Sequence, residues 1–277
     1  MLRFLRRVWV DGAINALAVL STLFLAVATL LAGQDQPDDT YWDAWGAPFI
    51  LRLAAVGYIA LFTFWKWLDA RLEKEQKKRA EASAARLEAD ANLTAACQTI
   101  AALIVGYCAA ATPPVAVAID ELATQFWVPR VRAGSEVIER VARFVLWDRP
   151  GSGVVWTKGK GIVGHAWANA APFSLDLRPL RAKLALGEAA FNALPEAERL
   201  GMSYADVTKT KLYTGIAVRP LFDPDDPTTF LGLFVTDFRG NTGFDCVETA
   251  MAQYGPIDAI LSGCQAILKK GYGTGAG

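Results

Sequence analysis

The chain has 277 residues, of which 53% are hydrophobic, a high share for a soluble protein and enough for one large domain or two small ones. Its 28 basic and 28 acidic residues cancel, so the overall charge gives no reason to expect nucleic acid as a partner. The four cysteines form no CxxC pair and lie far from the single histidine, which argues against a zinc site and favours reduced core cysteines.

Two apolar runs near the N-terminus predict a transmembrane hairpin over residues 1–67. The first run, residues 12–33, contains no charged side chain and is long enough to cross a hydrocarbon core of roughly 30 Å. The second run, residues 47–67, has Arg52 close to its start and tryptophans at its end, as expected for a membrane interface.

The charges that flank these runs predict their orientation. Arginines precede the first run, and lysines and arginines follow the second, whereas residues 34–46 between them carry only acidic charges. The positive-inside rule then places both termini in the cytoplasm, with the chain a multi-pass protein of the inner (cytoplasmic) membrane and the lipid bilayer its first partner. A cleaved signal peptide and a pair of buried helices are the alternatives, and the length of the uncharged run disfavours both.

Residues 68–90 lack glycine and proline and are rich in strong helix formers, so they predict a charged connecting helix. Large apolar residues are too sparse for a regular heptad pattern, which leaves either a solvated connector or a weak coiled coil that forms a homodimer. The helix is expected to continue to Ala111 and to end at Pro113. Residues 115–128 are expected to form a short helix or irregular structure.

Residues 91–268 predict an α+β domain, an antiparallel sheet with helices packed on one face. Strands are expected at 141–148 and 154–159 as a hairpin, then at 172–177, 213–222 and 230–240, since these segments are rich in β-forming residues and bounded by turns. A short helix is expected after the glycine-rich turn, helical segments over 178–212, and a closing helix over 245–268 with a bend at Gly255. Residues 269–277 are expected to be a flexible tail.

Several motifs in this region resemble the GAF domain, a small-molecule sensor module. The stretch "GKGIVGHAWANAAPFSL" follows the family's glycine pattern, and "AVRPLFDPDDPTTFLGLFVTDF" follows its later strand–turn–strand pattern. The closing "GFDCVET" departs from the usual helix start, and the insertion over 178–212 is longer than usual. The resemblance implies a pocket between the sheet and the covering loops. Known family members bind cyclic nucleotides or tetrapyrroles, and the cysteine that links tetrapyrroles has no counterpart here.

The glycine-rich stretch is expected to be architectural. Gly159, Gly161 and Gly164 would allow a tight turn and a close approach to the sheet, because glycine adopts positive φ without strain. The spacing is not that of a phosphate-binding loop, and no Rossmann unit surrounds it. The neighbouring His165 is expected to be either a structural histidine or a ligand contact at the pocket rim.

Candidate ligand-binding residues are those that combine polar or aromatic character with positions near the expected pocket. The candidates are Trp156, His165, Asp176, Tyr213, Arg219 and Asp237. Packing in the core is the alternative role for Trp156. An ion pair between Arg219 and Asp237 is the alternative for these two residues.

These features together predict a membrane-anchored, non-enzymatic sensor or regulatory protein. Its cytoplasmic domain would bind a nucleotide-like or other small molecule, or a partner protein. The alternative is a two-span effector that makes the membrane leaky when it binds a nucleotide signal. No catalytic residues, metal site or cofactor are assigned, because no nucleophile with an orienting partner is apparent.

Overall fold

The computed structural model describes residues 46–147, 152–210 and 212–272. Contacts divide the chain into two compact units, Met1–Glu81 and Ala82–Gly277, and the division falls inside the predicted charged connecting helix. The first predicted membrane run, residues 12–33, lies outside the described residues. The prediction of a two-helix hairpin therefore remains a prediction.

The longest element is helix α2, Gly46–Ala110, which is continuous over its 65 residues. It includes the backbone of the second apolar run, the charged segment and a more apolar C-terminal part. The helix ends just before Pro113 and Pro114, which lack the backbone N–H that would continue it. The helical predictions for residues 47–67 and 68–111 are confirmed to within a residue or so at their ends.

Helix α2 exposes large apolar side chains in its N-terminal part. Leu61 is 69% exposed, Phe64 58% and Trp67 54%. The stretch from Val56 to Ala110 is long and apolar enough to cross a membrane, and 33% of its most apolar window is buried. A core helix of a soluble protein passes the same test. The exposed aromatic and aliphatic side chains are what distinguish the N-terminal part of α2 from such a buried helix.

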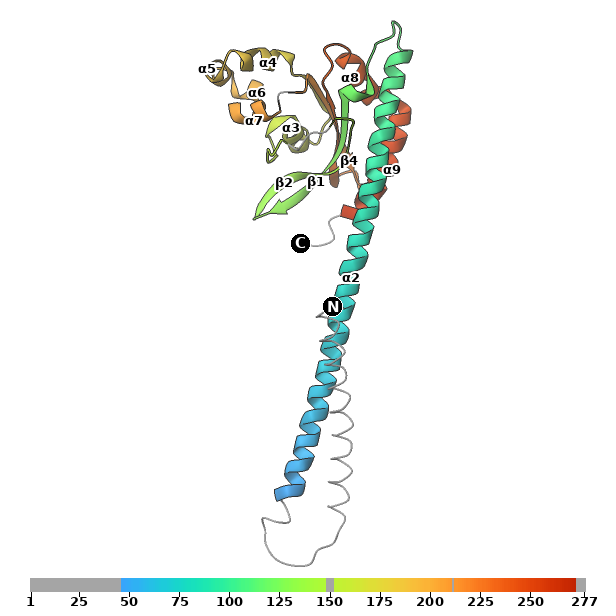
Figure 1. Cartoon of the computed structure of the whole chain (residues 1–277), viewed down its shortest axis with the longest axis vertical. Helices are drawn as coiled ribbons and strands as arrows, with labels where there is room; N and C mark the ends of the chain where they lie inside the picture. Colours follow the sequence, from blue (N-terminus) through green and yellow to red (C-terminus); the bar gives the residue numbers. More distant parts are fainter. Residues whose placement is uncertain (1–45, 148–151, 211, 273–277) are drawn as a thin grey trace, which may run out of the picture. The chain divides into compact units, whose positions relative to one another are not determined.

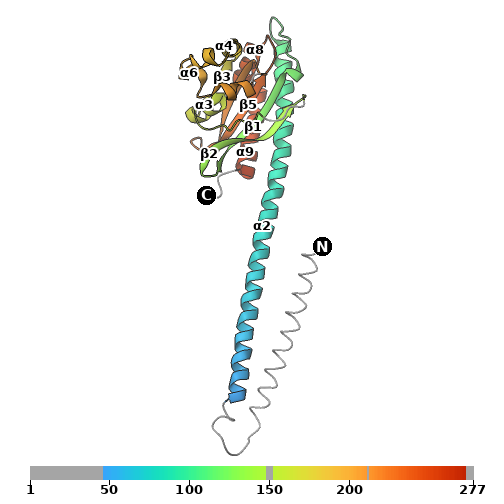
Figure 2. The same ribbon diagram turned by 60° about the vertical axis from the view of Figure 1, so that its left-hand side comes forward.

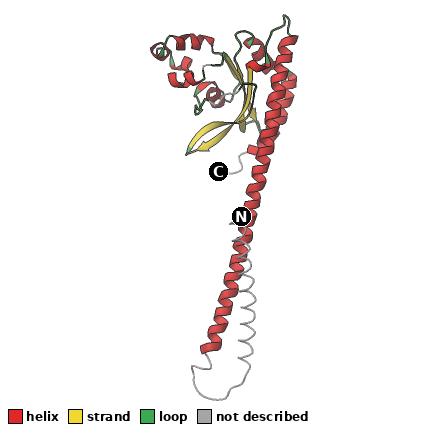
Figure 3. Cartoon of the chain, viewed as in Figure 1, coloured by secondary structure: helices red, strands yellow, loops and turns green. Residues whose placement is uncertain are grey.

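The sheet has five antiparallel strands in the order β2-β1-β5-β4-β3. The sheet lies between the C-terminal part of the long helix and some of the shorter helices (Figures 1 and 3). The bounds of the strands are β1 Leu122–Arg132, β2 Ser135–Val145, β3 Phe173–Asp176, β4 Gly215–Phe222 and β5 Phe230–Phe238. The predicted α+β class with an antiparallel sheet is confirmed, and β3, β4 and β5 lie where strands were expected.

Two strand predictions were wrong. The segment 115–128 was expected to be helical or irregular, which holds up to the short 3₁₀-helix Ile119–Glu121. From Leu122 it instead forms β1, which pairs with both β2 and β5. Residues 154–159 were expected to pair with 141–148, but they contribute only a single bridge, between Trp156 and Ile138. The hairpin partner of β2 is β1, and Trp156 bridges to Ile138 of β2 in addition.

Helices cover both faces of the sheet, so the prediction of helices on one face was also wrong (Figures 1 and 2). On one face lie α8, α9 and the part of α2 that follows Ala82. On the other face lies α3 with the helical insertion. The bounds are α3 Gly161–Asn169, α4 Arg178–Ala185, α5 Glu188–Asn192, α6 Glu196–Arg199, α7 Tyr204–Lys209, α8 Phe244–Gln253 and α9 Gly255–Tyr272. The closing helix thus breaks beside Gly255, where a bend was expected.

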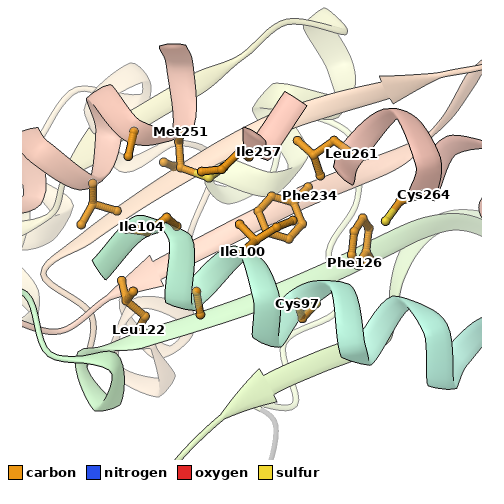
Figure 4. Close-up of a cluster of buried hydrophobic side chains, with 14 of the residues drawn as sticks. Cys97, Ile100, Ile104, Leu122, Phe126, Phe234, Met251, Ile257, Leu261 and Cys264 are labelled. Carbon is orange, nitrogen blue, oxygen red and sulfur yellow. The ribbon is translucent and has the colours of Figure 1, made fainter. Parts of the chain in front are cut away.

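The core on the α2 side is apolar and closely packed (Figure 4). Phe126 of β1 and Phe234 of β5 are fully buried, with ring centroids 4.9 Å apart. Two buried threonines satisfy their hydroxyls here: Thr124 donates to the Cys97 carbonyl at 2.9 Å, and Thr236 contacts the Met251 sulfur at 3.3 Å. Burial raises the pKa of the Cys97 thiol to about 12, so this cysteine is an unreactive core residue, as expected.

Candidate ligand-binding cavity

A cavity lies on the opposite face of the sheet, beneath α3 and the helical insertion. Its apolar walls include Trp156, Ile162, Leu180, Met202, Val207 and Ile216. The space open to the centres of water molecules is about 70 Å³. One water needs roughly 10–15 Å³ by this measure, so the cavity holds several waters or a small organic molecule.

The floor of the cavity is polar because neighbouring strands place polar side chains side by side. Gln125 of β1 and Asp237 of β5 are buried, with 3% and 6% of their surfaces exposed. The Gln125 amide Nε2 donates a hydrogen bond to the Asp237 carboxylate, and its Oε1 accepts one from Nη1 of Arg140 at 3.1 Å. Gln125 therefore connects a buried acid to a cation on β2.

The cavity contains more positive than negative charge among its described lining residues. Arg140, Arg143 and Arg181 line it, against the single carboxylate of Asp237. Desolvation lowers the pKa of Arg140, and the positive charge of Arg143 lowers it further. A guanidinium stays charged even so, which leaves a positive field where the cavity meets the sheet.

Two groups beside Arg140 and Arg143 shape the polar part of the cavity. The Arg140 guanidinium lies over the Trp127 ring, 5.7 Å from its centroid, and Arg143 Nη2 donates to the Tyr213 hydroxyl at 3.5 Å. The Trp127 indole N–H is buried and has no acceptor within the described structure. A buried donor without an acceptor costs about 1–3 kcal/mol, so this indole is a costly feature of the cavity wall.

The glycine-rich turn is architectural, as the sequence predicted, but its close approach is to the segment that carries Trp156 and Thr157 rather than to the sheet. Gly161 has φ +65°, and a Cβ there would lie 2.4 Å from the Trp156 ring. Gly164 sits inside α3, where a Cβ would lie 2.2 Å from the Thr157 carbonyl oxygen. The missing side chains thus allow α3 to pack directly on the segment that carries Trp156.

The structure brings together only part of the predicted site. Trp156, Tyr213 and Asp237 line the cavity. His165 does not line it, and its ring lies beside Phe173 with centroids 6.2 Å apart. Asp176 faces Arg178 in a bidentate ion pair, with Nη2–Oδ2 at 2.6 Å, and the hydrogen bond from Arg178 lowers the pKa of this carboxyl.

Arg219 also lies away from the cavity, and its suggested ion pair with Asp237 was wrong. In the register of β4 and β5, Arg219 pairs with Phe234 and Asp237 pairs with Ile216. Because successive side chains alternate between the two faces of a strand, these two residues point to opposite faces. Arg219 instead donates to the Met251 carbonyl at 2.8 Å and pairs with Asp258.

The sequence reasoning missed Gln125, Trp127, Arg140 and Arg143, which form much of the polar part of the cavity. The first two lie on β1, which was not recognised as a strand. Arg140 pairs with Trp127 and Arg143 with Gln125, and the register shift between Phe126 and Trp127 leaves Val141 of β2 without a partner in the register. Such an irregularity is invisible in a periodicity count.

Comparison with known proteins gives no further guide to the site. No family model matches the chain, and a search of curated proteins finds no match. Within the described ranges, no group of histidine, cysteine, aspartate and glutamate side chains could hold a metal ion. The geometry of the cavity is therefore the basis for a functional assignment.

Asp206 links the glycine turn to the insertion and allows a pH test. Its carboxylate accepts the Ser203 hydroxyl at 2.8 Å at the start of α7 and pairs with Lys160 at 3.0 Å. Burial raises the pKa of Asp206, but the hydrogen bonds from Lys160 and Ser203 outweigh it, so the pKa lies below its ordinary value.

We expect the variant Asp206→Asn to lose about 1 kcal/mol of stability at neutral pH. A lowered pKa stabilises the fold above the unfolded-state pKa, which is about 4, and this gain disappears as the pH falls through the folded-state value. The melting temperatures of the native chain and the variant should therefore differ at pH 7 and converge below about pH 4. A gap that persists at low pH would show that the charge of Asp206 does not contribute.

Proposed function

We propose that the chain is a membrane-anchored, non-enzymatic sensor whose unit from Ala82 onward binds a small molecule in the cavity. The observation that carries this proposal is the cavity itself, in which apolar walls surround a buried polar cluster of Gln125 and Asp237 that reaches Arg140. Pockets for small ligands typically have this composition, with a few polar groups that fix orientation.

The membrane anchor is supported by the exposed apolar side chains of α2. Leu61, Phe64 and Trp67 would each be costly in water, and a lipid or a partner helix would cover them. Together with the predicted run at 12–33, they favour a hairpin with both termini in the cytoplasm. A homodimer through residues 68–90 remains part of the proposal.

The GAF resemblance also remains a proposal, and the position of the glycine turn supports it. The turn leads into a short helix, α3, which is followed directly by the edge strand β3, in the order that the motif implies. The alternative role as a ligand-triggered two-span effector that makes the membrane leaky draws no support from any contact among the described residues. A cavity that holds a small molecule suits a compact ligand better than a large nucleotide.

The test is native mass spectrometry of the full chain, extracted from membranes of its own host with a non-ionic detergent. We expect the chain to sediment with membranes until detergent is added, and to retain a small molecule of defined mass. The variant Ile216→Phe should lose that molecule, because Ile216 lines the cavity and a phenyl ring would fill it. The variant Leu186→Phe, at a position 73% exposed, should retain it.

Each half of the proposal can fail separately. A chain that stays in the supernatant without detergent contradicts the membrane anchor. A chain that carries no ligand in either the native form or the Leu186→Phe variant contradicts the sensor role.

A further inference from the structure

We infer that the cavity selects a small organic anion, with a carboxylate or phosphate group facing Arg140 and an apolar body against Trp156. This inference rests on the proposed function and names the class of ligand. It follows from the hydrogen bonds among Gln125, Asp237 and Arg140, from the charge of the residues that line the cavity, and from the volume of the cavity.

The hydrogen bond that Arg140 makes leaves most of its guanidinium donors for a ligand. Arg140 Nη1 donates to Gln125, whose own amide donates to Asp237, so the buried carboxylate is engaged by an amide rather than directly by this guanidinium. A guanidinium has five N–H donors, and Gln125 takes one of them. The remaining donors form the planar fork that suits a two-oxygen acceptor such as a carboxylate or phosphate.

Arg140 and Trp127 together form one wall of the cavity. Arg140 lies over Trp127, which keeps its guanidinium plane beside the cavity, and the Trp127 indole N–H is a buried donor without an acceptor. An indole can only donate a hydrogen bond. The wall therefore offers the Arg140 guanidinium as a charged donor, and an anion is a better partner for it than a neutral acceptor.

The charge of the lining residues and the volume of the cavity both favour a small anion. Arg140 and Arg143 lie on the same strand and both line the cavity. Desolvation lowers the pKa of Arg140, and the positive charge of Arg143 lowers it further. An anion between them would relieve this repulsion. About 70 Å³ of open space accepts a short apolar chain or small ring rather than an extended polyanion.

The experiment uses the full chain in dodecyl maltoside, a neutral detergent that brings no anionic lipid headgroup. The probes are butyrate, ethyl phosphate, the neutral analogue butyramide and the cation butylamine, each titrated to millimolar concentrations by ligand-observed NMR. We expect one or both anions to bind at least about tenfold more tightly than butyramide, and butylamine not to bind. The preferred anion identifies the head group as carboxylate or phosphate.

Two variants locate the interaction. Arg140→Gln should weaken anion binding about tenfold or more, whereas Arg239→Gln should leave it unchanged, because Arg239 pairs with Asp120 and does not line the cavity. If Arg140→Gln fails to fold, Arg140→Lys serves instead and should weaken binding while retaining charge.

The outcomes separate this inference from the proposed function. Equal binding of butyramide and butyrate, or equal loss in both variants, overturns the anion class and leaves a ligand-binding cavity. Absence of binding by all four probes also overturns it, and native mass spectrometry of the retained ligand then decides whether the sensor role survives.

Discussion

Replacement of Phe234 by alanine should lower the free energy of unfolding by about 3–5 kcal/mol, the largest effect that we expect from a single change in the unit from Ala82 onward. Phe234 is fully buried in the central part of the sheet, packs against Phe126, and faces the helices α2 and α9. The cavity left behind would be lined by residues from strands and helices alike, and these cannot all move to fill it.

Thermal unfolding of the full chain in detergent, followed by near-UV circular dichroism, measures this effect. A loss of 1 kcal/mol lowers the melting temperature of a domain of this size by roughly 2–4 °C, so Phe234→Ala should lower it by about 10 °C. Leu186→Ala provides the matched control, since its side chain is 73% exposed and should change stability by less than about 0.5 kcal/mol. Similar shifts in the two variants would contradict a packed core at Phe234.

The substitution Gly164→Ala should destabilise the chain, while Gly263→Ala should stabilise it, although both replace a glycine inside a helix. Alanine normally improves a helix by about 0.5–1 kcal/mol over glycine. At Gly263 in α9 the new methyl group meets nothing within 4 Å, so this gain should appear in full. At Gly164 the methyl group would lie 2.2 Å from the Thr157 carbonyl oxygen, which belongs to the backbone and cannot rotate away.

Relief of that clash requires α3 to move off the segment 154–157. The shift would also stretch the hydrogen bond from the Gly159 N–H to the Gly164 carbonyl, 2.9 Å long in the native chain. Overpacking of this kind costs about 1–3 kcal/mol, so the melting temperatures of the two variants should shift in opposite directions. A stabilising effect at Gly164 would show that the glycine turn is not held against α3.

The elements that the sequence predicted well are those with strong local signals. The long helix α2 follows from its apolar runs and from the segment 68–90, which is rich in helix formers and lacks glycine and proline. Strands β4 and β5 follow from apolar segments separated by the turn "DPDDPTT". The glycine turn was recognised because positive φ and close approach leave a direct mark on the sequence, as Gly161 shows.

Strand β1 was missed for a physical reason. It is covered on both faces, so its residues do not alternate between apolar and polar in the simple way of a half-buried strand. Thr124 and Gln125 are both buried, the first against α2 and the second in the cavity floor. Two adjacent polar residues inside an apolar stretch therefore resembled irregular structure.

The site residues were predicted only where aromatic or acidic character coincided with the correct face. Asp237 and Tyr213 reach the cavity, whereas Arg219 reaches the other face of the same sheet. The alternation of side chains along β4 and β5 contains this information, but it becomes usable only once the register between the strands is known.

The two buried threonines connect the cavity floor to the helices on the other face of the sheet. Thr124 and Thr236 are cross-strand partners that contact α2 and α8, and the residue after each one, Gln125 and Asp237, belongs to the cavity floor on the reverse side. Each of these two strands thus has a polar contact to a helix on one face and, one residue later, a polar group of the cavity floor on the other face. In the proposed sensor, a shift of either strand on ligand binding would change the contact of its threonine with Cys97 of α2 or Met251 of α8.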